Sequence, residues 1–343
     1  MSLLSEIAEQ PAVVARLLAE AADETDRVGR LLARARHLTF AARGSSDNAA
    51  TYGKYLFEGL AGIVTSSAAP SLLTRYKTPP RYEGGAVVGI SQSGASPDVA
   101  AVVMAARRGG ALTVAITNRA DSSLARAAEH TIALRCGPER AIAATKTYTA
   151  SCAALAMLAS AAAGAAGHKM LAFAGLVDSI EEAAARERDA SRLARRIGTA
   201  RALVVLGRGF AYAAALEAAL KIKELARVWA EPYSSADFAH GPRTLLERGT
   251  PVLMLAARGA VETEARSMVS SMRRRGARVY AITNDARLAS RADDAVVLER
   301  TLPEALEPIA LAVVAQHVAA HVARRHGRDP ERPVGLSKVT RTL

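Results

Sequence analysis

The sequence contains one pattern of apolar segments twice, at an offset of about 165 residues. Residues 203–209, LVVLGRG, repeat the pattern of residues 38–44, LTFAARG, and residues 278–284, RVYAITN, repeat residues 112–118, LTVAITN. Each apolar run is too short for a helix and is typical of a buried strand. Because the offset stays constant, the sequence predicts an internal duplication with two domains of the same fold.

Within each copy, strands alternate with helical segments, and no hairpin turn joins them. This order predicts a parallel sheet covered by helices on both faces. We therefore predict an α/β protein with two tandem doubly wound parallel-sheet domains. Residues 5–36 have apolar positions at helical spacing and are expected to form one or two helices packed on the first domain. The predicted boundaries are an N-terminal helical segment at residues 1–36, a first domain at 37–165, a linking helix at 166–199, a second domain at 200–326 and a C-terminal tail at 327–343.

Composition excludes several classes of protein. Half of the 343 residues are hydrophobic, but no charge-free apolar run reaches the ~20 residues of a membrane-spanning helix, and the alanine-rich residues 150–166 come nearest. The first residues, MSLLSE, place no basic segment before an apolar one, so no signal peptide is expected. The two isolated cysteines, Cys136 and Cys152, predict neither a disulfide framework nor a metal cluster. We expect a cytoplasmic protein with no membrane partner.

The formal net charge of +12 raises the question of a nucleic-acid partner. The arginines are scattered over the polar faces of predicted helices, and no aromatic residues are interleaved with them. We therefore expect solvated helix faces and no nucleic-acid partner, with some attraction for anionic substrates. Only seven of the 45 basic residues are lysines. Lysine, unlike arginine, can lose its proton or form a Schiff base, so these few positions are candidates for chemistry.

Residues 86–98, AVVGISQSGASPD, join a strand to the start of a helix through a turn rich in hydroxyl groups. Ser96 can cap that helix, Pro97 suits its first turn and Asp98 suits its positive end. Unpaired N–H groups and serine hydroxyls at one helix N-terminus form an anion site. An ordinary turn between a strand and a helix is the alternative. Four hydroxyl or amide side chains within six residues favour a phosphate site.

The second copy has lost these hydroxyls, because residues 256–259, AARG, stand where the first copy has SQSG. We expect it to contribute residues 217–242 instead. Lys221 and Glu224 lie three positions apart and share one face of a predicted helix. His240 follows in a turn held by glycine and proline, an arrangement suited to proton transfer near a carboxylate. The alternatives are a solvated ion pair and a structural histidine.

The last segment, residues 329–340, has no helical or strand periodicity. Prolines and glycines spaced between its apolar residues predict a strap laid over the surface, with Lys338 near its end. A disordered tail is the alternative.

Together, these motifs resemble the sugar isomerase (SIS) family, and in particular the isomerase half of glucosamine-6-phosphate synthase. The similarity covers nearly the whole chain and implies two flavodoxin-like SIS domains. It rests on GSS at residues 44–46, SQSG at 91–94, GPE at 137–139, ATK at 144–146, KIKE at 221–224, HGP at 240–242 and SKVT at 337–340.

The resemblance implies roles for individual residues. Glu224 would move a proton between C1 and C2 of the sugar, with Lys221 beside it, and Lys338 would contact the sugar carbonyl or form an imine with it. His240 would open the sugar ring, acting in the site of a neighbouring subunit of a homodimer. No metal or organic cofactor is implied. The residues that would hold the phosphate are Ser45, Ser46, Ser91, Gln92, Ser93 and Ser96, and those that would line the sugar site are Glu139, Ala144 and Thr145.

Two departures from the synthase pattern stand out. Ala95 and Ser96 replace a Glu-Thr pair, which keeps the hydroxyl. The synthase draws ammonia from glutamine through an N-terminal cysteine, whereas this chain begins Met1-Ser2 and its first cysteine is Cys136. We therefore expect an enzyme similar to the stand-alone relatives that deaminate or deglycate amino sugar phosphates.

The expected reaction converts glucosamine 6-phosphate to fructose 6-phosphate and ammonium. One alternative is a deglycase or isomerase acting on another phosphosugar, such as fructosamine or galactosamine 6-phosphate. Another is a glutamine-independent enzyme similar to glucosamine-6-phosphate synthase. A phosphosugar-sensing DNA-binding regulator is disfavoured, because about 36 residues before the first strand are too few for a DNA-binding module and a linker.

Overall fold

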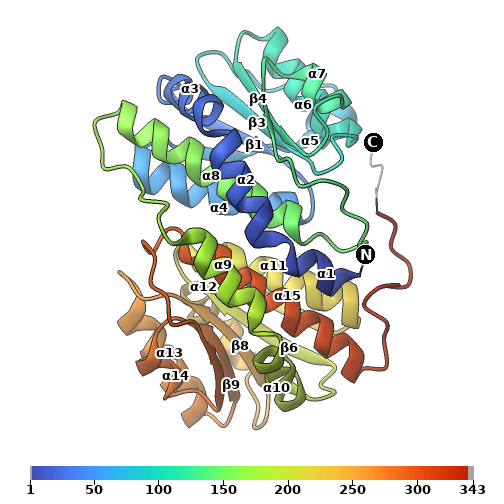
Figure 1. The fold of residues 1–343 in the computed structure, drawn as a ribbon, viewed down its shortest axis with the longest axis vertical. Coiled ribbons are helices and arrows are strands. Elements are labelled where there is room, and N and C mark those ends of the chain that lie inside the picture. The colour runs from blue at the N-terminus through green and yellow to red at the C-terminus, as the bar shows by residue number, and fades with distance from the viewer. Residues whose placement is uncertain (1, 339–343) are drawn as a thin grey trace. The chain divides into compact units, whose positions relative to one another are not determined.

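The computed structural model describes residues 2–338 (Figure 1). The end of the predicted tail, including Val339 and Thr340 of the SKVT motif, lies outside the described residues, as does Met1. The chain divides into two compact units. Among the described residues, the first-repeat unit comprises 12–139, 146–172 and 337–338, and the second-repeat unit comprises 2–11, 140–145 and 173–336.

The first-repeat unit contains a five-stranded sheet in which every strand pair is parallel. The strand order is β2-β1-β3-β4-β5, as in a flavodoxin-like fold. Its strands are β1 (Leu38–Ala41), β2 (Thr65–Ser67), β3 (Ala86–Ile90), β4 (Leu112–Thr117) and β5 (His130–Ala133). Its helices are α3 (Ala22–Leu32), α4 (Ser45–Ala61), α5 (Pro70–Thr74), α6 (Pro97–Arg108), α7 (Ser123–Ala127) and α8 (Lys146–Ala165), and α2 (Gln10–Glu20) begins in the other unit.

The core of the first-repeat unit forms around β3 and α8. Every residue of β3 is buried, which explains why its sequence is continuously apolar. Helices α3 and α4 pack against α8 (Figure 1). Within the described residues, α8 is the one helix long and apolar enough to cross a membrane, and 89% of its most apolar window is buried inside the protein. Its alanines and Gly29 of α3 allow close helix packing, because a Cβ at Gly29 would lie 2.5 Å from Cβ of Ala161.

The second-repeat unit contains a second parallel sheet, with the equivalent order β10-β9-β8-β6-β7. Helix α11 packs against α15 in its core. The strands are β6 (Ala202–Gly207), β7 (Trp229–Ser234), β8 (Pro251–Ala256), β9 (Arg278–Thr283) and β10 (Asp294–Val297). The helices are α1 (Leu3–Ala8), α9 (Leu176–Ala185), α10 (Glu187–Ile197), α11 (Ala211–Ala226), α12 (Ser235–Ala239), η1 (Pro242–Leu245), α13 (Glu262–Arg274), α14 (Ala286–Ala289) and α15 (Glu307–Arg325).

These two sheets confirm the predicted α/β fold with tandem doubly wound parallel sheets. The duplication is visible in the strand positions, because β3 begins at Ala86 and β8 begins 165 residues later, at Pro251. The N-terminal segment differs from expectation, since it forms three helices instead of one or two. Helix α3 packs on the first-repeat unit as predicted, whereas α1 packs against α15 and α9 of the second-repeat unit.

A buried carboxyl group joins the end of β9 to the start of α15. The side chain of Glu307 is fully buried, and its Oε1 accepts hydrogen bonds from Nδ2 of Asn284 at 2.6 Å and from the N–H of Leu302 at 2.6 Å. Its other oxygen, Oε2, has no hydrogen-bond partner among the described residues. Burial raises the pKa of Glu307 from 4.5 to about 7, and the two hydrogen bonds only partly oppose this rise.

This raised pKa predicts a stability that falls as the pH rises. Because the folded protein holds the Glu307 proton up to a pKa of about 7 and the unfolded chain loses it near 4.5, the free energy of unfolding should decrease across that interval. We expect Glu307→Gln to match the wild type near pH 4.5 and to be more stable by about 3 kcal/mol above pH 7.5. Urea unfolding at several pH values tests this. The exposed Glu247→Gln is the control, and a difference that does not change with pH would contradict the prediction.

Candidate active site

The serine-rich turn lies where ligands bind in open parallel sheets. The strand order places β1 beside β3, and the chain leaves these strands for opposite sides of the sheet, which opens a crevice at their carboxyl ends. The loop after β1 carries Ser45 and Ser46, both half-buried at the start of α4. An ion pair of 2.9 Å between Nε of Arg43 and the buried carboxylate of Asp98 ties this loop to the start of α6.

The turn after β3 is held in one conformation. Gly94 has a φ of +61°, and a Cβ at this position would lie 2.0 Å from Oγ of Ser122, so only glycine fits. The backbone oxygen of Gly94 accepts hydrogen bonds from Leu124 N at 3.0 Å and from Oγ of Ser123 at 2.8 Å. The start of α7 therefore fixes the position of the turn.

Ser96 lies where the sequence predicted a helix cap, but it does not make the predicted capping hydrogen bond. Ser96 occupies the N-cap position of α6, yet its hydroxyl makes no capping hydrogen bond. It lies 3.2 Å from Oγ of Ser91 instead, while the N–H of Val99 donates to Oδ1 of Asp98 at 2.9 Å. Because Asp98 satisfies that helix N–H, the hydroxyl of Ser96 pairs with the other serine of the turn.

A cavity of about 750 Å³ opens beside this turn, within the first-repeat unit. The loops after β3, β4 and β5 line it, together with Lys338. Its volume suits a small-molecule ligand of the size of a sugar phosphate. Of the residues predicted from the sequence, Gln92, Ser93, Glu139 and Lys338 line the cavity. Ser91 and Ser96 in the turn after β3, and Ser45 and Ser46 at the start of α4, are not among its lining residues.

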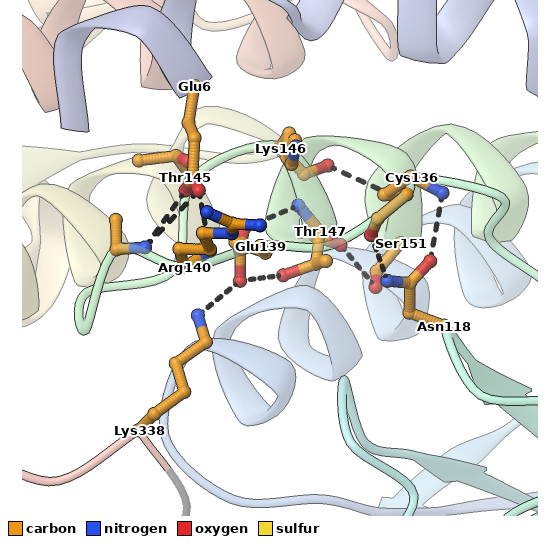
Figure 2. Close-up of polar contacts among 12 residues, drawn as sticks. Glu6, Asn118, Cys136, Glu139, Arg140, Thr145, Lys146, Thr147, Ser151 and Lys338 are labelled. Carbon is orange, nitrogen blue, oxygen red and sulfur yellow. Dashed lines mark hydrogen bonds and ion pairs between the residues drawn. The ribbon is translucent and has the colours of Figure 1, made fainter. Parts of the chain in front are cut away.

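Glu139 connects the cavity to the start of α8 (Figure 2). Its side chain is fully buried, and it accepts hydrogen bonds from the N–H of Thr147 at 3.0 Å and from Oγ1 of Thr147 at 2.9 Å. The side chain of Lys338 is one-quarter exposed, and its Nζ lies 2.6 Å from Oε2 of the same carboxylate. The ion pair brings the strap to the cavity, where the ammonium group of Lys338 can contact a bound anion or carbonyl oxygen.

The sequence interpretation missed the contribution of the loop after β4. Asn118 lines the cavity, and its side chain accepts from Cys136 N at 2.8 Å and donates to the carbonyl of Gly137 at 2.7 Å. It therefore fixes the loop that carries Glu139. Cys136 itself is buried, and burial raises the pKa of its thiol well above the usual range, as expected for a packing residue rather than a nucleophile. Asn118 could have been found from its position directly after an apolar strand.

In the second-repeat unit, α11 holds a buried cluster of charges. Nζ of Lys221 forms ion pairs with the carboxylate of Glu224 and, at 3.6 Å, with Oε1 of Glu217. The side chains of Lys221 and Glu217 are 2% and 1% exposed, and that of Glu224 is 24% exposed. The predicted shared face of Lys221 and Glu224 is confirmed, and the solvated alternative is wrong because the lysine is buried. Glu217, one helical turn before Lys221, was not anticipated.

His240 ends α12 and is exposed. Its N–H donates to the carbonyl of Asp237 at 3.0 Å, and the next residue, Gly241, has a φ of 136°, which favours glycine. Phe238, which is fully buried, packs against Tyr233 with ring centroids 5.5 Å apart and anchors the turn. These contacts hold the backbone of the turn at His240, and the imidazole itself is exposed.

The segment that carries Ala144 and Thr145 belongs to the second-repeat unit. The buried carboxylate of Glu6 in α1 accepts the N–H groups of Arg140 and Ala141, at 2.5 and 3.2 Å (Figure 2). Nε2 of Gln316 lies 3.4 Å from the carbonyl of Thr145. These contacts from two distant helices, α1 and α15, explain why this short segment is ordered without being helix or strand.

Comparison with known proteins gives consistent matches. A family model described as SIS domain matches residues 31–161 and 197–324. The glutamine–fructose-6-phosphate aminotransferase of Methanothermobacter thermautotrophicus is 35% identical over 344 residues, which cover 98% of this chain and 56% of that protein. The corresponding protein of Gloeobacter violaceus is 34% identical over 98% of this chain and 58% of its own length. The chain thus spans a little over half the length of these curated relatives.

Solved structures match over nearly the full chain. A protein of Silicibacter pomeroyi assigned to the phosphosugar isomerases is 36% identical, with a TM-score of 0.84 over 96% of this chain and 100% of that one. The C-terminal domain of the glucosamine-fructose-6-phosphate aminotransferase of Francisella tularensis has the same TM-score at 24% identity, over 96% of this chain and 98% of that one. The likeness to the Francisella tularensis domain supports the fold alone.

Proposed function

Because this chain belongs to the SIS domain family, we propose that it is a phosphosugar isomerase that acts on an amino sugar phosphate and releases ammonium. Its relatives are phosphosugar isomerases and the isomerase part of an aminotransferase. The observation that carries the proposal is the cavity of about 750 Å³ beside the serine-rich turn, which Glu139 and Lys338 also line. It offers hydroxyl and amide groups for a phosphate and an ammonium group for the remainder of the sugar.

The phosphate is assigned to the turn after β3. Ser93 and Gln92 line the cavity, and the hydroxyls of Ser91 and Ser96 lie next to them in the same turn. Hydroxyls, an amide and the N-terminus of α6 together stabilise a dianion without a metal ion. The turn is rigid, so the phosphate would fix the position of the sugar before any proton moves.

The chemistry is assigned to Glu224, His240 and Lys338. His240 would protonate and open the sugar ring, and the carboxylate of Glu224 would carry the C2 proton to C1, because the neighbouring carbonyl makes that proton acidic. The imine that forms at C2 would add water and lose ammonia, giving a ketose phosphate. Since the amine of Lys338 is already held by Glu139, we assign it to hydrogen bonding with the sugar oxygen rather than to imine formation.

We assign glucosamine 6-phosphate as the substrate and fructose 6-phosphate as the product; fructose 6-phosphate is part of the name of the 35% identical aminotransferase. The test is release of ammonium and fructose 6-phosphate from glucosamine 6-phosphate by the purified protein. Ser93→Ala should raise KM for this substrate, because a phosphate ligand is lost, and the exposed Ser290→Ala serves as the control.

A substrate panel separates this assignment from its alternatives. Fructosamine 6-phosphate and galactosamine 6-phosphate carry the same phosphate, so the turn after β3 would hold them equally well. The proposal would be refuted if the protein bound these phosphosugars with no turnover of any of them. A preference for fructosamine 6-phosphate in kcat/KM would instead assign a deglycase.

A further inference from the structure

The second-repeat unit has a cavity at the position that corresponds to the candidate active site. This second cavity has a volume of about 510 Å³. Residues from β10 and from the loops after β8, β9 and β10 line it, as the loops after β3, β4 and β5 line the first. Because the two sheets have the same strand order, the duplication explains why each cavity lies at the same position in its own sheet. The loops that line them, however, have diverged.

The divergence replaces one hydroxyl group with a cation and removes the polar side chains before it. At the strand offset of 165 residues, Ser93 of the first cavity corresponds to Arg258 of the second. The residues that directly follow β4 and β9, Asn118 and Asn284, line their own cavities. Arg287 comes from α14, which follows β9, and is exposed, as is Arg258. The second cavity therefore keeps the amide and, like the first with its Arg119 and Arg135, is lined by arginines, but it lacks the serine-rich turn.

The charges that line the second cavity are balanced in number, with three arginines and three carboxylates, but they are not evenly paired. Its acidic residues are engaged: Asp285 and Glu262 pair with Arg266 at 2.6 and 3.2 Å, and Glu299 pairs with Arg186 at 3.1 Å. Within the described part of the chain, neither Arg258 nor Arg287 forms an ion pair. Arg258 and Arg287 thus line the cavity without an ion pair among the described residues, and guanidinium is well suited to bidentate binding of phosphate.

Buried groups hold the loop that carries Arg258 in place. Oδ1 of Asn284 accepts the N–H of Arg258 at 2.7 Å, and Nδ2 of Asn284 donates to the fully buried Glu307 at 2.6 Å. The side chain of Asn284 is itself 7% exposed. The backbone at Arg258 is therefore fixed by a buried chain of hydrogen bonds, which lowers the entropic cost of binding an anion there.

We propose that the second cavity binds a small molecule that bears a phosphate group, through Arg258 and Arg287, as a site separate from the one that holds the substrate. The proposal rests on the paired cavities and on the unpaired cations, and it does not depend on which reaction the first cavity supports. It would act as an effector site, because none of the residues assigned to catalysis, Glu224, His240 and Lys338, lines this cavity. A free phosphate and a phosphate ester share that chemistry.

Calorimetric titration of the full chain tests the proposal. Sorbitol 6-phosphate is the probe, since it resembles a hexose phosphate but has no carbonyl group to turn over, and inorganic phosphate is the second probe. We expect two binding sites per chain for sorbitol 6-phosphate. The double variant Arg258→Ser/Arg287→Ser should lose one of them, with affinity at least about tenfold weaker, and Ser91→Ala/Ser93→Ala should weaken the other.

A matched control separates site binding from net charge. Arg274→Ser/Arg325→Ser removes two exposed arginines of the same unit and should leave both sites intact. If only the Arg258/Arg287 variant loses binding of inorganic phosphate, the site recognises the phosphate group alone. If that variant loses binding of sorbitol 6-phosphate and the wild type does not bind inorganic phosphate at this site, the ligand is a phosphate ester. One site per chain, unchanged by the Arg258/Arg287 variant, would overturn the proposal, as would equal weakening in the control.

Discussion

Replacement of Glu224 by glutamine should lower the rate of ammonium release from glucosamine 6-phosphate by about a hundredfold to ten-thousandfold, the usual contribution of a general acid–base group. The amide has nearly the shape of the carboxylate but cannot accept the C2 proton. Lys221 keeps its other partner, Glu217, at 3.6 Å, so the helix should retain its structure. Because the phosphate is held elsewhere, KM should change little while kcat falls.

The measurement is steady-state release of ammonium and of fructose 6-phosphate, compared with binding of sorbitol 6-phosphate by the same variant. Glu231→Gln, an exposed carboxylate in the same unit, is the matched control and should keep wild-type kcat. Full activity of Glu224→Gln would rule out the proton-transfer role. A loss of ligand binding in parallel with kcat would point to a structural role instead.

Replacement of Lys221 by methionine should destabilise the protein by about 3–5 kcal/mol, because it removes the cation from a buried cluster of charges. The side chains of Lys221 and Glu217 are almost completely buried, so the variant leaves the Glu217 carboxylate without this counter-charge. Urea unfolding measures the effect. Lys223→Met on the same helix is the control, because Lys223 is exposed and its replacement should change stability by less than about 0.5 kcal/mol.

A double variant tests whether the loss comes from the unpaired charge. Lys221→Met/Glu217→Gln removes both buried charges and should recover part of the stability lost in Lys221→Met, as expected when an uncompensated charge is the cause. Additive losses from the two substitutions would contradict this account. They would indicate that packing around α11, rather than charge, dominates the effect.

Much of the fold follows from local sequence patterns. Strands β3 and β4 begin and end where their apolar runs do, because each lies inside a sheet and is buried on both faces. Strand β7 was missed, since Glu231 and Pro232 interrupt any strand pattern. It pairs with β6 alone, at the edge of its sheet, where proline is tolerated. The missed strand is thus one whose sequence lacks the apolar pattern of the others.

The candidate site was predictable where its groups are close in sequence. Lys221 and Glu224 share a helix face, and Ser91 and Ser96 share a turn, so spacing alone brings each pair together. Asn118 and Glu6 were missed, because each acts on a loop far away in the sequence. The hydrogen bond to an N–H group at the start of α6 was expected from Ser96 and is made by Asp98. Both are good capping residues, so the sequence does not decide between them.

Glu139 links the beginning of a core helix to the far end of the polypeptide. The same buried carboxylate binds the first turn of α8 through Thr147 and holds the ammonium group of Lys338. Proteolytic cleavage within residues 327–337 would free the ammonium group of Lys338. The buried carboxylate of Glu139 would then lose this ion pair. An intact C-terminal segment therefore contributes to the order of the loop that carries Glu139, and its cleavage should lower the affinity of the cavity for a ligand.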